Sequence, residues 1–72
     1  MEQKIYNSKE LGLIIRKKRK EQGLTQEDLA GITGTGIRFI SELERGKETA
    51  HLGKVIHVIS SLGLLLTISS KW

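Results

Sequence analysis

Apolar residues in the first third of the chain recur at helical spacing, between glycines that mark the ends of segments. Asn7 or Ser8 can cap a first helix, because short polar side chains accept hydrogen bonds from the free amides of a first turn. Within this helix, Leu11, Ile15 and Arg19 are four residues apart and share one face. The pattern predicts a helix that turns Arg19 toward the core and ends at Gly23.

Three further short helices are predicted. Thr25 is followed by acidic residues and caps a second helix, which Gly34 ends within two turns. A third helix runs from about Gly36 to Arg45, and Thr49 caps a fourth. The apolar residues expected on the buried sides of these three helices are Leu29, Ala30, Ile32, Ile40, Leu43, Leu52, Val55, Ile56, Ile59 and Leu62.

The last apolar run of the chain has the pattern of a β-strand. Its residues favour extended structure, and it is too short for another packed helix. A lone strand leaves its backbone groups unpaired, and no other segment has a convincing β pattern. We therefore expect it to pair antiparallel with its own copy across a two-fold axis, with a frayed apolar tail as the alternative. The residues predicted to form this dimerisation strand are Leu64, Leu65, Leu66, Thr67, Ile68 and Ser69.

Length and composition narrow the class of protein. The 72 residues suit one small domain, which at this size usually gains stability by association. The chain has no cysteine, which excludes disulfides and cysteine-ligated zinc and is typical of a reducing compartment. The longest apolar run is too short to cross a bilayer, and no signal-type core is present. We expect a soluble, unprocessed, cytoplasmic homodimer that does not insert into a membrane.

Charge is concentrated in the first two thirds of the chain. The formal net charge is +4, and all eight acidic residues lie at or before Glu48. Residues 16–20 are five consecutive basic residues, and Arg38, Arg45 and Lys47 form a second basic group. A basic run alone is most often a solvated helix face, so it indicates nucleic acid only when a binding motif accompanies it.

Residues 26–47 contain such a motif. Ala30 is small where two helices must cross, and Gly34 tolerates the positive φ of the turn between them. The block resembles the helix-turn-helix of the Cro/XRE repressor class, although Thr35 stands where a branched apolar residue is more usual. The resemblance implies an all-α fold of four short helices with a Cro-type helix-turn-helix, plus the C-terminal β-strand that pairs across a homodimer. The predicted organisation is an N-terminal tail at residues 1–6, a helix-turn-helix DNA-binding domain at residues 7–63, and the dimerisation strand and tail at residues 64–72.

The third helix is the candidate for reading DNA. If Ile40 and Leu43 face the core, Arg38 lies opposite, where it can make a bidentate contact to guanine. Ile37 lies on the flank, where a thymine methyl can pack. For Glu42 three roles stay open: it accepts a hydrogen bond from cytosine N4, it repels phosphates and so sharpens specificity, or it pairs with Arg38 or Arg45 and contacts no part of the DNA. The predicted DNA-binding residues are Thr25, Gln26, Gly36, Ile37, Arg38, Ser41, Glu42, Arg45, Lys47, Lys17 and Lys20.

Four further polar residues are expected to have structural and not DNA-binding roles. Arg19 shares the buried stripe of the first helix, and the family resemblance pairs it with Glu44 in a structural ion pair. His51 and His57 lie at no metal-ligand spacing, so we expect surface or interface residues and no metal or cofactor. No nucleophile and base are signalled together, so we expect no enzyme.

The chain is also similar to the HipB group of antitoxin repressors over residues 11–66. The blocks that carry this likeness are Leu11-Gly12, Ile15-Arg16, Gly23-Leu24-Thr25-Gln26, residues 38–47, Thr49-Ala50, Leu52-Gly53-Lys54-Val55 and Leu62-Gly63-Leu64. The resemblance implies a homodimer that binds a palindromic operator upstream of its own operon and associates with a HipA-like serine/threonine kinase toxin. Two-fold symmetry would place the recognition helices about 34 Å apart, on successive major grooves.

Two other functions share parts of this pattern. A stand-alone phage or mobile-element repressor of the XRE class would keep every DNA-facing residue and lack the kinase partner. A protein-interaction adaptor would keep the fold without DNA binding. Trp72 is either an anchor for a partner or an exposed terminal residue.

Overall fold

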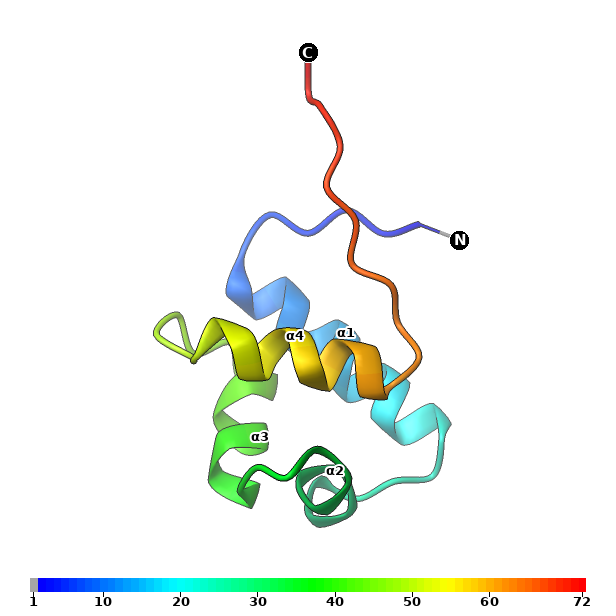
Figure 1. The fold of residues 1–72 in the computed structure, drawn as a ribbon, viewed down its shortest axis with the longest axis vertical. Coiled ribbons are helices and arrows are strands. Elements are labelled where there is room, and N and C mark those ends of the chain that lie inside the picture. Colours follow the sequence, from blue (N-terminus) through cyan, green and yellow to red (C-terminus); the bar gives the residue numbers. More distant parts are fainter. Residues whose placement is uncertain (1) are drawn as a thin grey trace.

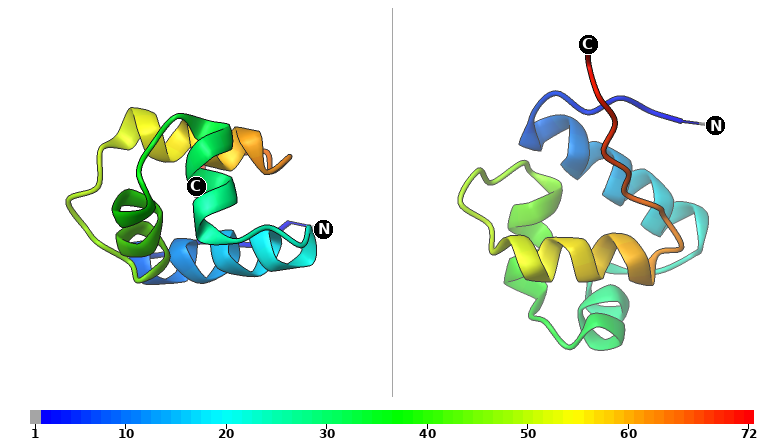
Figure 2. Two further views of the ribbon diagram at one scale, coloured as in Figure 1. Left: turned by 90° about the horizontal axis from the view of Figure 1, so that it is seen from below. Right: turned by 45° about the horizontal axis from the view of Figure 1, so that its top comes forward.

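All four predicted helical segments are helices in the computed structural model, which describes residues 2–72 (Figure 1). The helices are α1 (Ser8–Glu21), α2 (Gln26–Thr33), α3 (Ile37–Glu44) and α4 (Leu52–Ser61). Viewed from below, α1 and α4 lie on opposite sides of the α2–α3 pair (Figure 2). No helix within residues 2–72 has the length and apolar character needed to span a bilayer.

Side-chain caps fix where α1 and α2 begin. The Asn7 side chain accepts a hydrogen bond from the Glu10 amide at 2.8 Å. Thr25 and Asp28 form a capping box, in which each side chain accepts from the other's backbone N–H at 3.0 and 2.9 Å. Gly34 then ends α2 with φ of 68°, a left-handed conformation that favours glycine and turns the chain into α3.

The predicted cap of α4 is wrong. The helix starts later than the sequence suggested, because Thr49 lies in a turn before it. His51 caps α4 instead, and its Nδ1 accepts from the Lys54 amide at 3.3 Å. An imidazole nitrogen can accept a hydrogen bond as a hydroxyl does, although histidine is not among the usual capping residues.

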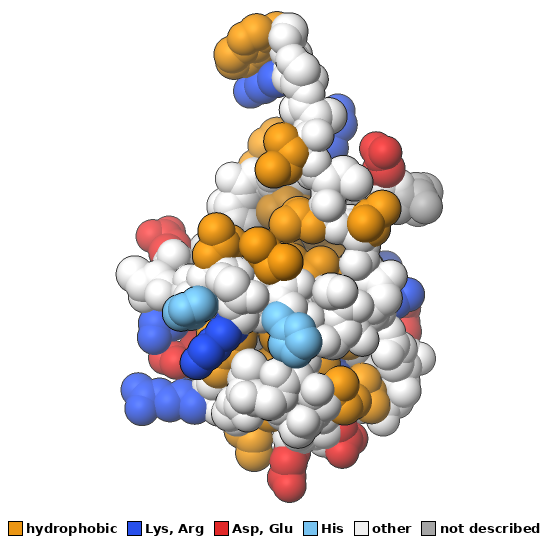
Figure 3. Space-filling model, in the orientation of Figure 1, with side chains coloured by type: hydrophobic (Ala, Val, Ile, Leu, Met, Phe, Trp, Pro, Cys, Tyr) orange, Lys and Arg blue, Asp and Glu red, His pale blue; other side chains and the backbone are white. Residues whose placement is uncertain are grey.

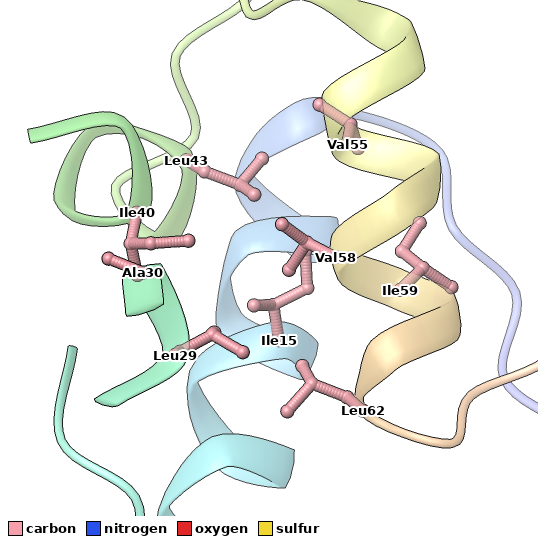
Figure 4. Close-up of a cluster of buried hydrophobic side chains, with 9 residues drawn as sticks. All are labelled: Ile15, Leu29, Ala30, Ile40, Leu43, Val55, Val58, Ile59 and Leu62. Carbon is pink, nitrogen blue, oxygen red and sulfur yellow. The ribbon is translucent and has the colours of Figure 1, made fainter. Parts of the chain in front are cut away.

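One apolar core joins the four helices. The buried side chains of α2 and α3 point toward those of α1 and α4 (Figure 4). The core residues are Ile15, Leu29, Ala30, Ile40, Leu43, Val55, Val58, Ile59 and Leu62. Three predicted core residues, Ile32, Leu52 and Ile56, are exposed instead. Thr33 of α2 and Val58 of α4 are buried in their place.

Gly12 allows α1 to approach the end of α3 closely. A Cβ atom at this position would lie 2.5 Å from the Leu43 carbonyl oxygen and 2.6 Å from that of Glu44. A second link joins the same two regions, because the Ser8 hydroxyl donates to the Gly46 carbonyl at 2.8 Å. The start of α1 is therefore fixed against the end of the predicted recognition helix.

The predicted C-terminal β-strand is wrong. The structure contains no strand within residues 2–72, and the chain after Leu64 extends away from the helices (Figures 1 and 2). Leu64 donates its amide to the Ile59 carbonyl at 3.1 Å and packs against the core of its own chain. The segment has β-favouring residues, but a strand requires a neighbouring ladder, and nothing in the described chain supplies one. The residues affected by this correction are Leu64, Leu65, Leu66, Thr67, Ile68 and Ser69.

Candidate nucleic-acid interface

The helix α3 has a buried side and an exposed side. Ile40, Leu43 and Glu44 are buried against the rest of the domain. The Arg38 side chain is 89% exposed, so its guanidinium is free to meet a partner outside the protein. Because Ser41 lies three residues after Arg38, both are on one side of the helix, which has the dimensions to enter a major groove.

The start of α3 is open to solvent. Gly36 is the N-cap in an extended conformation and contributes no side-chain cap. Ile37 is 48% exposed on the first turn. Phe39 lies on another side of the helix, where it packs against the core and has the Lys54 ammonium 5.8 Å from its ring centre. The apolar flank available to DNA is thus Ile37.

Glu42 lies between two basic side chains on the exposed side of α3. Its Oε1 is 3.7 Å from Arg38 Nε, and its Oε2 is 3.3 Å from Lys47 Nζ. Arg45 is exposed nearby at the C-terminal end of the helix. Of the three roles that the sequence leaves open for Glu42, this arrangement corresponds to pairing. Its partners are Arg38 and Lys47, and not Arg45.

Beneath this surface, Arg19 and Glu44 form a buried two-point ion pair. Arg19 Nε donates to Glu44 Oε2 at 2.6 Å, and Nη2 donates to Oε1 at 3.0 Å. Arg19 also donates from Nη1 to the Leu24 carbonyl at 2.7 Å. The hydrogen bond to Glu44 raises the pKa of Arg19 above its ordinary value. Burial alone would raise the pKa of Glu44, but hydrogen bonds from Arg19 and Gln26 hold it below its ordinary value.

The N-terminal end of α2 is linked to the same pair. Gln26 Nε2 donates to Glu44 Oε1 at 3.1 Å, so this amide is oriented by the ion pair. Thr25 is exposed, and its hydroxyl is occupied by the Asp28 amide in the capping box. The first-turn amides of α2 lie beside these groups, where the helix dipole favours an anion such as a phosphate.

A shallow cleft brings these elements together. Its lining residues are Arg16, Arg19, Gln26, Ser41, Glu44 and Arg45, from α1, α2 and the end of α3. Arg16 was not among the predicted DNA-binding residues. The signal was present in the sequence, because Arg16 lies four residues after Gly12 and three before Arg19, on the side of α1 that meets α3.

Lys17 and Lys20, the two residues of α1 predicted to contact DNA, do not line this cleft. Lys17 and Lys20 line a separate exposed surface with Leu13, Arg16 and Glu21. Lys17 follows the buried Ile15 by two residues, so it lies on the opposite side of α1 from the core. Lys20 lies one helical turn beyond Arg16. Arg16 therefore borders both surfaces, whereas Lys17 and Lys20 line the surface on α1 and not the cleft that contains Arg45.

Within residues 2–72, no three or more His, Cys, Asp or Glu side chains are grouped so that they could hold a metal ion. His51 and His57 are both exposed, and His51 serves as the cap of α4.

Comparisons with known proteins agree with this geometry. The chain matches the family described as Helix-turn-helix over residues 15–64. It is 46% identical over 68 residues to the uncharacterized HTH-type transcriptional regulator y4mF from Sinorhizobium fredii, a match that covers 94% of this chain and 90% of the relative.

Solved structures give two further likenesses. A chain in the structure of a HipA-HipB-O2-O3 complex is 28% identical, with a TM-score of 0.88, across 99% of this chain and 100% of that chain. The restriction-modification controller protein C.AhdI from Aeromonas hydrophila is 26% identical, with a TM-score of 0.70, across 79% of this chain and 83% of its own.

Proposed function

The chain belongs to the helix-turn-helix family of the XRE (Cro) type and is a DNA-binding transcriptional regulator of that class; on this basis we propose that it is a sequence-specific repressor that binds a palindromic operator as a homodimer. The observation that carries the proposal is the exposed Arg38 guanidinium, which projects from α3 opposite the buried Ile40 and Leu43. A groove-reading helix needs this division between a side that packs and a side that reads.

The proposed contacts divide between bases and backbone. Arg38 reads guanine, Ile37 packs against a thymine methyl, and Ser41 contacts a base or a phosphate. The α2 amides with Thr25 and Gln26 hold a backbone phosphate. Basic side chains around these groups add attraction that does not depend on sequence. These are Arg16, Lys17, Lys20, Arg45 and Lys47.

The homodimer is proposed to form through the outer face of α4 and the C-terminal segment. Hydrophobic side chains gather on the face that contains α4 and residues 64–72 (Figure 3). The exposed apolar residues of these two elements are Leu52, Ile56, Leu65, Leu66, Ile68 and Trp72. An apolar patch of this kind marks a protein contact, and a two-fold axis through it would present two copies of α3 to one DNA duplex.

A kinase partner is proposed because of the HipB likeness. HipB occurs with HipA in the complex to which this chain is similar, so we propose that a HipA-like serine/threonine kinase toxin is the protein partner and that this chain is the antitoxin. The likeness to C.AhdI favours the second candidate, a regulator that acts without a toxin. Binding of purified protein to the product of the adjacent gene distinguishes the two, since only an antitoxin forms that complex.

The DNA contact is tested with two duplexes, one from the region upstream of the gene and one of random sequence. We expect salt-dependent binding to both, with a preference for the upstream duplex. Arg38→Ala should weaken binding to the upstream duplex by about 1–3 kcal/mol and random binding by less. Lys4→Ala, which makes the same charge change in the N-terminal segment, is the control. Equal losses on both duplexes would refute base reading by Arg38.

A further inference from the structure

The position of Glu42 is not explained by the contacts proposed so far. It is an acidic residue in the middle of a surface that is proposed to face a polyanion. Its side chain is only 24% exposed, whereas that of Arg38 is 89% exposed. A carboxylate fixed at this place lowers the attraction of the surface for every phosphate, so it should reduce DNA affinity. Its presence therefore needs an explanation other than affinity.

The backbone holds Glu42 and Lys47 in register. The Lys47 amide donates to the Glu42 carbonyl at 3.0 Å, and the Gly46 amide donates to the Leu43 carbonyl at 3.0 Å. This is the double hydrogen-bond pattern that closes a helix before a left-handed glycine. The Lys47 side chain then returns to the Glu42 carboxylate, with Nζ 3.3 and 3.4 Å from its two oxygens. Lys47 is thus tied to Glu42 through both backbone and side chain.

Arg38 reaches the same carboxylate from the other side. It precedes Glu42 by one helical turn, and its Nε lies 3.7 Å from Oε1. Each oxygen of the Glu42 carboxylate therefore faces a cation of the same protein, so the carboxylate is not free to accept a hydrogen bond from a base edge. In the free protein it offsets one of the two positive charges that Arg38 and Lys47 bring to the surface.

We propose that Glu42 is a specificity-determining residue that acts on Arg38 and Lys47 and not on a base. On random DNA these cations gain only phosphate contacts, and Glu42 competes with the phosphates for both of them. On the operator Arg38 meets the paired acceptors of guanine, and two directed hydrogen bonds exceed a single contact at 3.7 Å. Glu42 therefore weakens non-specific binding more than specific binding. This inference rests on the proposed DNA-binding function.

The test is Glu42→Gln, with Glu2→Gln as the matched control. Both variants remove one negative charge, but Glu2 lies in the exposed N-terminal segment, away from α3. Fluorescence anisotropy on the upstream and random duplexes over a salt series is the measurement. For Glu42→Gln we expect random affinity to rise roughly threefold to tenfold at low salt, with a salt slope steeper by about one unit. Upstream affinity should rise less, so the ratio between the duplexes falls.

A double-variant comparison tests whether Glu42 acts through Lys47. In a Lys47→Met background, Glu42→Gln should raise random affinity by less than it does in the natural protein. A merely structural role would not change the salt slope. Glu42→Gln behaviour equal to that of Glu2→Gln would overturn the inference, and so would a loss of upstream affinity with unchanged random affinity, since that loss indicates direct base reading. If the natural protein binds neither duplex, the proposed function and this inference fail together.

Discussion

Arg19 Nε and Glu44 Oε2 lie 2.6 Å apart beneath the surface that is proposed to read DNA, and they join α1 to α3. Both side chains are almost fully buried, at 8% and 2% exposed. Two charges at such depth cost solvation, which their own contact and the bonds to Leu24 and Gln26 offset. Both side chains are therefore committed to joining α1 to α3, although Arg19 belongs to the basic run.

Removing one partner of this pair should unfold the domain. Arg19→Met leaves the Glu44 carboxylate buried without its cation, so we expect a loss of about 3–5 kcal/mol in the free energy of unfolding. Urea denaturation followed by circular dichroism measures this loss. Lys17→Met is the control, because it removes the same charge from the exposed side of the same helix. Equal stability of the two variants would show that the pair contributes nothing to folding.

Acid should destabilise the fold through Glu44. In the folded protein the pKa of Glu44 lies below its ordinary value of 4.5, so the ionised carboxylate stabilises the fold. This contribution is complete above the unfolded pKa and is lost as the pH falls through the lowered folded pKa. We expect the free energy of unfolding to decline below about pH 4.5.

Glu44→Gln separates this effect from other carboxylates. The variant should be less stable at neutral pH and should show a smaller decline on acidification. Asp28 also has a lowered pKa, because the Thr25 amide donates to it in the capping box, so part of the decline should remain in the variant. An unchanged pH profile in Glu44→Gln would exclude Glu44 as a source of acid sensitivity.

Gly12→Ala should disrupt the contact between α1 and α3. The added methyl group would meet the carbonyl oxygens of Leu43 and Glu44 at 2.5 and 2.6 Å, and backbone atoms cannot move aside without shifting a helix. We expect a loss of about 1–3 kcal/mol from this overpacking. Gly31→Ala is the control, since a Cβ there meets nothing within 4 Å, and it should gain up to about 1 kcal/mol from helix propensity. Thermal unfolding of both variants tests the contrast.

Removal of residues 65–72 should convert the proposed dimer to a monomer. Leu64 is retained because it packs against its own core, so the four helices should survive the truncation. Sedimentation equilibrium measures the mass, and circular dichroism checks the helices. Lys4→Ala, which changes the exposed N-terminal segment and leaves the apolar patch intact, is the control and should stay dimeric. Dimers of the same affinity after the longer truncation would place the two-fold contact elsewhere.

Local chemistry made the helices predictable from the sequence. Asn7, Thr25 and Gly34 act over a few residues, so their capping and turning roles could be deduced without knowing the tertiary fold. The exposed position of Arg38 followed from the period of α3 alone. These features depend on spacing within one helix.

The errors arose where the outcome depends on other elements. Thr49 lies in a turn before α4, and His51 caps the helix instead, a difference that no local pattern in the sequence records. The apolar run after Leu64 has the composition of a strand, but composition does not supply a backbone partner. Arg16 was not predicted as a cleft residue because its place there comes from the approach of α1 to α3, a contact between segments far apart in the chain.

The two-sided character of α3 has a practical consequence for changing the DNA sequence that the protein prefers. The residues that anchor this helix, Ile40, Leu43 and Glu44, are distinct from Arg38 and Ser41 on its outer side. The outer residues can therefore be exchanged for those of a relative while the anchors stay as they are. Such a chimera should keep its melting temperature and acquire the operator of the donor, which makes this small domain a suitable scaffold for designed regulators.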